Sequence, residues 1–397
     1  MNIKTLKDID LKGKIVLYRA DLNVPMSHGR VEDATRITRL LPTFNYLIKQ
    51  KAKIVVLSHF GRPKGEFVRD LSLAPLADAL SQALDGKQVK FAIDCIGETA
   101  KNAVSQLEEG DILLLENLRF HAGETANNAA FSDDLASLGD IYVNDTFSCS
   151  HRKHSSIVGI AKRLPSAAGF LLQEEIENLE KVLNNPKKPM AAIVGGSKVS
   201  TKLDLLNAVI KKVECLIIGG AMANTFLAAQ GHDIGKSLHE PDLMDTAKQI
   251  IAQAEKSKCK IILPHDVVVS KDLKEKALCR VISLDKINKD EMILDIGPVT
   301  ISDIAEELSG FKTLIWNGPM GAFECRPFDV GTISLARAVA ALTTSKSLTS
   351  VAGGGDVVAA LGLAGLAESF TYVSTAGGAF LQWLEGNELP GISALRA

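Results

Sequence analysis

The chain has 397 residues, 46% hydrophobic and 23% charged, which is ordinary for a globular protein and long enough for two or three domains. Its 45 Lys and Arg nearly balance 47 Asp and Glu, and no basic block occurs, so we expect no nucleic-acid partner. The six cysteines form no C-x-x-C pair, a pattern that disfavours a zinc site or a disulfide framework.

The chain begins with a charged segment, MNIKTLKDIDLKGK, which lacks the apolar core of a signal peptide. No later segment reaches the roughly 20 apolar residues that a membrane span needs. The sequence therefore predicts a cytoplasmic protein without membrane association.

In the first half, short β-branched runs alternate with amphipathic segments. Strands are expected within 14–25, 53–63, 90–97 and 111–120, and helices within 34–50 and 71–84. Continuous apolar strands separated by amphipathic helices indicate a parallel sheet covered on both faces.

One amphipathic helix is predicted near the middle of the chain, over residues 168–186. Apolar residues recur at helical spacing from Leu172 to Leu183, after Gly169 and before Asn184-Asn185-Pro186. We interpret it as the joint between two domains, because 9 of the 13 arginines precede it and most paired glycines follow it. The alternative is a core helix of one large domain, although single cores rarely exceed about 250–300 residues.

The second half repeats the alternation of strands and helices. It does so in 189–200, 202–213, 214–231, 260–270, 312–323 and 347–365. The predicted fold is thus α/β, with two doubly wound, Rossmann-like parallel-sheet domains. We expect domains at 1–167 and 187–378, joined by the helix at 168–186, and a C-terminal segment at 379–397 that packs on the first domain.

Hydrogen-bonding and charged side chains follow four predicted strands of the first half, those within 14–25, 53–63 and 111–120 and a further one that begins the segment 141–150. Ligands of open parallel sheets bind at the carboxyl ends of the strands, so we expect these side chains to share one site. Arginine at such positions suits bidentate binding of phosphate or carboxylate. The residues concerned are Asp21, Asn23, His59, Arg62, Arg119, His151 and Arg152, with Arg36 near a helix start.

Glycines take the corresponding positions in the second half. Gly195-Gly196 precede Ser197, Lys198 and Lys202, which we place at the beginning of a helix. The segments Gly353–Asp356 and 374–379 repeat the order of strand, glycine and helix start. Free N–H groups at a helix start, together with close backbone approach, form a phosphate cradle, and Asp356 beside it suits Mg²⁺.

Several other signatures argue against competing functions. GHDIGKS at 231–237 has three residues between its glycines where a P-loop needs four, and no G-x-G-x-x-G, G-x-S-x-G or H-E-x-x-H occurs. Two alternative functions remain open. One is a hinged protein that binds an anion without chemistry, and the other is a kinase that acts on a different carboxylate.

The chain resembles the phosphoglycerate kinase family over essentially its whole length. The similarity rests on an ordered set of motifs: RADLNVP, SHFGRP, LLENLRFHAGE, SHRKHSS, VGGSKVSTKL, IGGAMANTFL, WNGPMGAFE, GGGD and LPGISAL. It implies reversible phosphoryl transfer between ATP and the carboxylate of 3-phosphoglycerate after domain closure. We expect a monomer, because the two-domain design needs no partner to complete its site.

The resemblance also implies roles for individual residues. The first domain would bind 3-phosphoglycerate or 1,3-bisphosphoglycerate through Asp21, Asn23, Arg36, His59, Phe60, Gly61, Arg62, Arg119 and Arg152. The second would bind ATP or ADP through Lys202, Asn317, Glu324, Gly353, Gly354, Gly355, Asp356 and Val357, with Mg²⁺ on Asp356. Arg36, Lys198, Gly355 and Gly378 would act on the transferred phosphoryl group.

Several departures from the family pattern concern this site. Thr146 and Ser148-Cys149-Ser150 stand where smaller residues are usual. Val357 stands where threonine is usual, which removes a possible hydroxyl contact, and Ala376 interrupts a usual glycine triplet. Cys149 lies in the substrate loop, where we expect a packing role.

Overall fold

The computed structural model describes residues 3–27, 29–183, 186–374 and 376–396. The chain forms two compact units: the first comprises Met1–Glu177 and Glu388–Ala397, the second Asn178–Asn387. We expected residues 379–397 to join the first domain, but the structure keeps residues up to Asn387 in the second unit. The reason is that α13, Gly377–Leu384, packs on α7, Leu203–Val209, of that unit.

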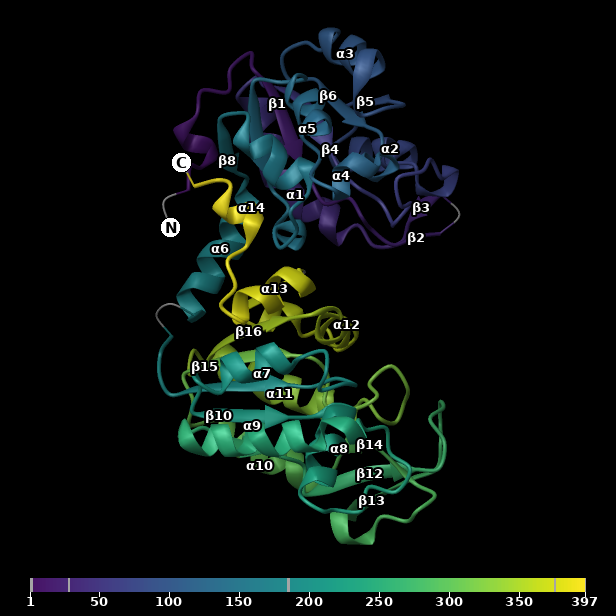
Figure 1. The fold of residues 1–397 in the computed structure, drawn as a ribbon, viewed down its shortest axis with the longest axis vertical. Helices are drawn as coiled ribbons and strands as arrows, with labels where there is room; N and C mark the ends of the chain where they lie inside the picture. Colours follow the sequence, from purple (N-terminus) through teal and green to yellow (C-terminus); the bar gives the residue numbers. More distant parts are fainter. Residues whose placement is uncertain (1–2, 28, 184–185, 375, 397) are drawn as a thin grey trace. The chain divides into compact units, whose positions relative to one another are not determined.

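The first unit is built on a six-stranded parallel sheet with the order β5-β6-β4-β1-β7-β8 (Figure 1). Its strands are β1 Ile15–Arg19, β4 Lys53–Leu57, β5 Val89–Ala92, β6 Ile112–Leu115, β7 Ile141–Asn144 and β8 Ser166–Ala168. The chain runs outward from β1 in both directions, so the order of strands reverses there. Ligand sites of doubly wound sheets lie at such a reversal.

Helices and a short hairpin complete the first unit. The helices are α1 Thr35–Lys49, α2 Ala74–Ala83, α3 Gly97–Ser105, α4 Ala122–Thr125, α5 Ala129–Ala136 and α14 Pro390–Ser393. The hairpin pairs β2, Met26–Ser27, with β3, Arg30–Val31, and was not predicted. Helix α1 buries Ile37, Leu40, Phe44 and Leu47 on one face, as its apolar spacing predicts.

Both ends of the chain belong to the first unit. Ile3 pairs with Arg396, and Thr5 pairs with Ala168 of β8. Gly391 of α14 donates its N–H to the carbonyl of Ser150 at 2.8 Å. The C-terminal residues are thereby anchored to the loop after β7, and Figure 1 shows both ends beside β8.

The central helix is α6, Phe170–Leu183, close to the predicted range. It begins directly after Gly169, whose carbonyl accepts from the N–H of Gln173 at 3.0 Å. Leu172, Ile176 and Leu179 are buried, as the spacing predicts. The expected stop signal at Asn184 and Asn185 lies outside the described residues.

The second unit contains another six-stranded parallel sheet, ordered β11-β10-β9-β15-β16-β17. Its strands are β9 Met190–Val194, β10 Cys215–Ile218, β11 Lys260–Ile262, β15 Thr313–Asn317, β16 Thr349–Gly353 and β17 Tyr372–Ser374. With α7 and α13, its helices are α8 Gly220–Ala229, α9 Met244–Lys256, α10 Pro298–Leu308, α11 Val330–Thr344 and α12 Gly355–Leu363. The order reverses between β9 and β15, and the predicted fold of two doubly wound sheets is confirmed.

A separate antiparallel sheet in the second unit was not predicted. It pairs β12, Asp266–Ser270, with β13, Cys279–Ser283, and with β14, Met292–Ile296. Three of its buried residues, Val267, Val269 and Ile293, form a small core with Leu227 of α8. This sheet places β14 against α8, beside the pocket described below.

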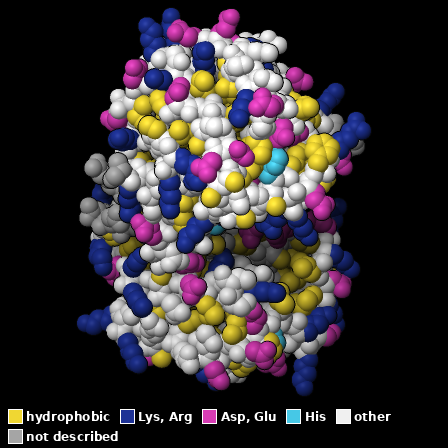
Figure 2. Space-filling view, turned by 45° about the horizontal axis from the view of Figure 1, so that its top comes forward, with side chains coloured by type: hydrophobic (Ala, Val, Ile, Leu, Met, Phe, Trp, Pro, Cys, Tyr) yellow, Lys and Arg dark blue, Asp and Glu magenta, His cyan; other side chains and the backbone are white. Residues whose placement is uncertain are grey.

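The surface carries mixed charge. Figure 2 shows Lys and Arg side chains scattered among Asp and Glu side chains over the visible face, in keeping with the net charge of −2. Among the helices of the described segments, none is long and apolar enough to cross a membrane.

Candidate active site

The first unit gathers polar side chains at the carboxyl ends of its central strands. Asn23 follows β1, Gly61 follows β4 and Arg119 follows β6. Gly61 donates its N–H to Asn23 Oδ1 at 2.9 Å and accepts from Arg119 Nη1 at 2.6 Å. The expected convergence of these strand ends is therefore present, and we call this group the substrate cluster.

Arg36, at the start of α1, is held beside β1 by two acceptors. Its Nη1 donates to Asp21 Oδ2 at 2.9 Å and to the carbonyl of Asn23 at 3.0 Å. Ser148 donates to the same carboxylate oxygen of Asp21 at 2.5 Å. A guanidinium has five N–H donors, so these bonds orient Arg36 and leave donors for a ligand.

His59 is a neutral hydrogen-bond donor in this cluster. It is buried, and its Nδ1 lies 3.1 Å from Nη2 of Arg19, which can only donate. Nδ1 therefore accepts, and the ring proton resides on Nε2. Burial lowers the pKa of His59 well below its usual range, and the charges of Arg19 and Arg119 lower it further.

A buried ion network supports His59 from behind. Arg19 is fully buried at the end of β1, and its Nε donates to Ser156 Oγ at 2.9 Å. Ser156 in turn donates its hydroxyl to Glu124 at 2.6 Å and its N–H to the same carboxylate at 2.9 Å. Burial opposes ionisation of Glu124, but His154, whose Nδ1 lies 3.6 Å from the carboxylate, the charge of Arg19 and the hydrogen bonds from Ser156 hold its pKa below the usual value.

None of these supporting residues, Arg19, Ser156 and Glu124, was predicted to belong to the site. A charged residue within the apolar run of β1 was the available signal for Arg19, because an arginine is rarely buried without partners.

Arg119 has an unused donor in a buried position. The residue is 6% exposed, and its Nε has no hydrogen-bond partner in the described part of the chain. Burial lowers the pKa of Arg119 to about 10, so the side chain stays charged at neutral pH. A buried unpaired N–H costs about 1–3 kcal/mol, which favours binding of an anion here.

The other expected substrate residues lie around the same cluster. Phe60 exchanges two hydrogen bonds with Asn117, at 3.2 and 2.8 Å. Arg62 is exposed beside Gly61, and Arg152 is half-buried with its Nε 3.2 Å from His151 Nε2. Burial, together with the charge of Arg152, lowers the pKa of His151 to about 4.

Cys149 faces this cluster rather than solvent. It is buried, and its Sγ lies 3.9 Å from His59 Nε2. Burial raises the pKa of its thiol. The thiol therefore stays protonated and packs against Ile157 and Val158, as expected.

In the second unit, Lys202 connects two central strands. Its Nζ donates to the carbonyl of Gly195 after β9 and to Oδ1 of Asn317 at the end of β15, both at 2.6 Å. Asn317 donates its amide to the carbonyl of Gly353, at the end of β16, at 2.6 Å. Burial lowers the pKa of Lys202 to about 8, while the nearby charge of Asp356 acts in the opposite direction.

Several positions at this edge require glycine, because neighbouring atoms lie too close to leave room for a side chain. A Cβ on Gly195 would lie 1.9 Å from the carbonyl oxygen of Pro319, and one on Gly353 would lie 2.5 Å from the ring of Phe380. Gly196 and Gly354 have φ of +121° and +111°, which other residues rarely adopt. The strand ends of this unit therefore present backbone rather than side chains.

Helix α12 begins at this edge with free N–H groups. Gly354 is its N-cap and supplies no side-chain bond, so the N–H groups of the first turn are available to an anion. Asp356 is exposed in that turn, and a Cβ on Gly355 would meet no atom within 4 Å. Gly378 is exposed at the second position of α13, and Thr375 before it lies outside the described residues.

One expectation about this edge needs correction. Ser197 and Lys198 lie in a loop, because the left-handed backbone at Gly196 interrupts any helix there and α7 begins only at Leu203. Val357 is fully buried in the hydrophobic core, so its side chain cannot reach a ligand and only its N–H is available.

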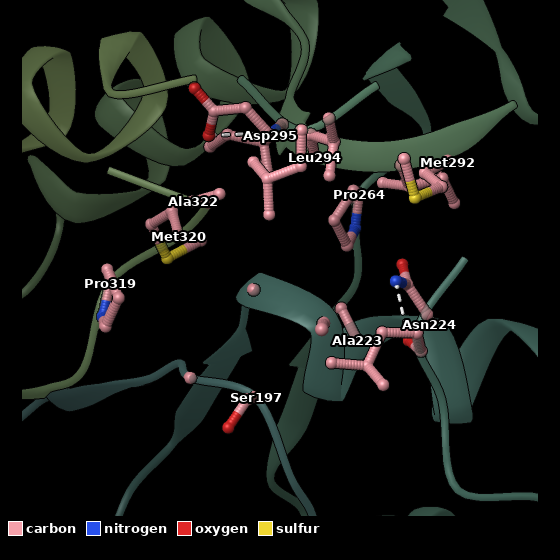
Figure 3. A pocket seen from close by; sticks show the side chains of 18 of the residues that line it. Ser197, Ala223, Asn224, Pro264, Met292, Leu294, Asp295, Pro319, Met320 and Ala322 are labelled. Atoms are coloured by element: carbon pink, nitrogen blue, oxygen red, sulfur yellow. Dashed lines mark hydrogen bonds between the residues drawn. The ribbon is translucent and has the colours of Figure 1, made fainter. Parts of the chain in front are cut away.

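A pocket of about 300 Å³ adjoins these glycines within the second unit (Figure 3). Apolar side chains from β14 and from the loop after β15 line it together with the start of α8. The lining includes Ala223, Asn224, Met292, Leu294, Pro319, Met320, Ala322 and Glu324. Of these residues, only Glu324 was predicted, since the apolar positions are scattered over distant segments.

Asp295 supports one wall of this pocket. Figure 3 shows its carboxylate directed away from the pocket, and it accepts the N–H groups of Ile296 and Gly331 at 2.9 and 2.7 Å. Burial raises the pKa of Asp295 to about 8, although the two N–H donors act against the rise. The carboxyl thereby ties β14 to the start of α11.

The chain forms two doubly wound units, one with buried arginines and one with a lysine among glycines. This combination is typical of α/β proteins that bind phosphorylated small molecules. A profile of the phosphoglycerate kinase family matches residues 6–387. Phosphoglycerate kinases of Rhizobium meliloti and Granulibacter bethesdensis are 55% and 54% identical over 397 residues, covering 100% of this chain and 99% and 100% of theirs.

Solved structures agree with these relatives. The phosphoglycerate kinase of Coxiella burnetii is 42% identical, with a TM-score of 0.89 over 99% of this chain and 98% of that chain. The enzyme of Pyrococcus horikoshii OT3 is 31% identical, with a TM-score of 0.86 over the same shares.

The chain belongs to the phosphoglycerate kinase family. It is a kinase of glycolysis that transfers a phosphoryl group between ATP and 3-phosphoglycerate, and this part of the sequence analysis is confirmed.

Proposed function

We propose that the substrate cluster binds 3-phosphoglycerate and that the glycine-rich edge of the second unit binds ATP. In terms of the sequence, residues 1–167 would form the substrate domain and 187–378 the nucleotide domain. The observation that carries the proposal is the buried Nε of Arg119, which has no hydrogen-bond partner among the described residues and lies in the same cluster as the neutral N–H donor His59 and the oriented Arg36. These groups suit one phosphate and one carboxylate.

In this proposal each residue of the substrate cluster has one task. His59, Arg62, Arg119 and Arg152 would hold the phosphate that is not transferred. Asp21 and Asn23 would bind the glycerate hydroxyl, with Phe60 and Gly61 shaping the site. Arg36 would neutralise the reacting carboxylate and the phosphoryl group in transit.

The second unit would hold the nucleotide by its phosphates and its base. The pocket beside α8 would take the base, with Asn317 and Glu324 near the sugar. Lys202 and the N–H groups of Gly353, Gly354, Gly355 and Val357 would bind phosphate oxygens. Lys198 and Gly378 would contact the transferred group.

The chemistry needs no general base, because the attacking carboxylate is already ionised at neutral pH. Catalysis then depends on in-line positioning and on neutralising the charge of the phosphoryl oxygens. Arg36, Lys198 and the first turns of α12 and α13 would provide that positive potential.

A magnesium ion fits the residues at this edge. Asp356 offers an exposed carboxylate, the hard oxygen ligand that Mg²⁺ prefers, on the first turn of α12 where phosphates are expected. Asp356 would therefore hold Mg²⁺ together with ATP or ADP. When bound, the ion would supply shielding of the nucleotide's charge.

The two substrates bind to different units in this proposal, so transfer requires the units to approach each other when both ligands are bound. Small-angle scattering with both ligands should then give a smaller radius of gyration than with either alone. We further propose that the protein is a monomer, since each half-site is complete within one chain. We also propose that it is located in the cytoplasm.

The test is a coupled assay of the purified protein with 3-phosphoglycerate, Mg²⁺ and ATP, run beside samples that each lack one component. Turnover that requires all three supports the proposal, and chelation by EDTA should abolish it. If both substrates bind but no phosphoryl group moves, the protein is an anion clamp without chemistry.

A further inference from the structure

A different group of potential ligands lies at the edge of the first unit's sheet. Asp94 and Cys95 follow β5, the edge strand, and His121 follows η3, Leu118–Phe120, beyond the neighbouring strand β6. An imidazole nitrogen, a thiol sulfur and a carboxylate oxygen of these residues lie within 4.8 Å of one another. The fold brings together two loops that are more than twenty residues apart in sequence.

Hydrogen bonds and a ring contact hold the side chains of Asp94 and His121 in place. His121 Nε2 lies 2.8 Å from Asp94 Oδ1, and the ring lies against Phe131 with centroids 5.3 Å apart. The N–H of Cys95 donates to the same Asp94 oxygen at 2.7 Å. Little rearrangement is therefore needed to present all three groups to one ion.

The burial of the group suits a metal ion that enters from solvent. Cys95 is fully buried, while the side chains of Asp94 and His121 are 41% and 31% exposed. The sulfur thus forms the inner wall, and the carboxylate and imidazole form the opening. Water from solvent can complete the coordination on that side.

The donor set favours zinc over magnesium. Zn²⁺ binds N and O at about 2.0–2.2 Å and S at about 2.3 Å, so tetrahedral ligand atoms lie roughly 3.3–3.7 Å apart. The present separations, 2.8 Å between nitrogen and oxygen and at most 4.8 Å to sulfur, bracket that range. A thiolate and a carboxylate neutralise a divalent cation, whereas Mg²⁺ prefers oxygen ligands alone.

We propose that Asp94, Cys95 and His121 bind one Zn²⁺ ion, with water as the fourth ligand. On binding, the Cys95 thiol releases its proton to solvent, and the ring proton of His121 moves from Nε2 to Nδ1. This ion is separate from the Mg²⁺ that accompanies the nucleotide. The sequence pattern disfavoured a zinc site because no pair of cysteines has a metal-binding spacing. A site of this kind leaves no such pattern, since only one of its three protein ligands is a cysteine.

The experiment is a titration of the EDTA-treated full-length protein with Co²⁺ in the absence of nucleotide. We expect a thiolate-to-cobalt charge-transfer band that saturates at one equivalent, with visible bands typical of tetrahedral coordination. Zn²⁺ should displace the cobalt stoichiometrically. The Cys95→Ser variant should lose the charge-transfer band, and Asp94→Asn and His121→Gln should bind Co²⁺ at least about tenfold more weakly.

Matched variants of the second unit serve as controls. Cys279→Ser removes an exposed thiol, and His265→Gln breaks an exposed pair with Asp303, 3.2 Å apart. Both should bind Co²⁺ like the wild type. If Cys95→Ser fails to fold by circular dichroism, Asp94→Asn decides the question, because it leaves the buried thiol in place.

A wild-type protein without the charge-transfer band, or a band that survives in Cys95→Ser or is undiminished in Asp94→Asn, overturns the proposal. Turnover with Mg²⁺ and ATP is measured separately and should be unchanged in zinc-free Cys95→Ser. The proposal of a zinc site and the proposal of phosphoryl transfer can therefore be refuted independently of each other.

Discussion

In our proposal both units bind an anion at the edge of a parallel sheet, but they do so with different chemical groups. The first unit offers charged and polar side chains, and Arg19, Asp21, His59 and Arg119 among them are buried. The second offers backbone N–H groups and glycines around the half-buried amine of Lys202. Side chains allow selective recognition of one small acid, whereas backbone approach suits phosphates that every nucleotide shares.

The largest expected effect comes from removing the oriented cation of the first unit. Arg36→Ala should lower kcat by about 10²–10³-fold, because a positioned donor to the transition state is lost. Stability should change by less than about 1 kcal/mol, since the pair with Asp21 is partly exposed. Arg30→Ala, on the exposed hairpin, is the control, and near-normal turnover of Arg36→Ala would remove our assignment.

In the second unit, adding one methyl group at a closely packed glycine should destabilise the fold at the glycine-rich edge. Gly195→Ala places a Cβ 1.9 Å from the carbonyl oxygen of Pro319, so the free energy of unfolding should fall by about 1–3 kcal/mol or more. Urea denaturation measures this change. Gly355→Ala is the matched variant, because its Cβ meets open space: its stability should stay within about 0.5 kcal/mol while KM for ATP rises. Wild-type stability of Gly195→Ala would contradict the close contact.

A conservative change should separate the two modes of recognition. Arg119→Lys keeps the charge but loses the planar guanidinium whose Nη1 donates to Gly61 and whose Nε is unpaired. We expect kcat/KM for 3-phosphoglycerate to fall about 10–100-fold, with KM for ATP unchanged. Arg69→Lys, at an exposed position, should have no effect on steady-state kinetics. An equal rise of KM for both substrates would argue against a role in one half-site.

The pH dependence should differ between the two substrates. Lys202 is charged below its pKa of about 8 and neutral above it, so kcat/KM for ATP should fall above that pH, approaching tenfold per pH unit. Lys202→Arg should remove the decline. His59 is neutral throughout, so kcat/KM for 3-phosphoglycerate should show no titration of this residue near neutrality. A flat ATP profile up to about pH 10 would show that Lys202 has an ordinary pKa.

The smallest effect concerns the departure at Val357. Because this side chain is fully buried in the core, Val357→Thr should lower the free energy of unfolding by about 1 kcal/mol, measured in urea. The affinity for ATP should change less than about twofold, since only the backbone N–H of this residue is available. A clear gain in ATP affinity would mean that the hydroxyl reaches the nucleotide.

The sequence predicted those elements whose pattern is local. Strands such as β1 and β6 are continuous apolar runs, and α1 has a regular apolar face. Strand β13 was missed because only one of its five residues, Ile282, is buried, so its sequence carries no apolar run. Its pairing with β12 arises from the surrounding fold.

Site residues at strand ends were predictable because topology alone brings them together, as with Asn23, Gly61 and Arg119. The partners behind them were not. Arg19 reaches Ser156, 137 residues away, and Lys202 reaches Asn317, 115 residues away. Such pairings depend on three-dimensional packing and leave no pattern along the chain.

The pairing of both chain ends within the first unit has a consequence for biosynthesis. On a ribosome the second unit, Asn178–Asn387, emerges as one uninterrupted segment and can fold as soon as it has left the exit tunnel. The first unit is translated earlier but lacks α14 and the pairing of Ile3 with Arg396 until residues 388–396 have been translated. The first unit can therefore be completed only after the whole of the second unit has been translated.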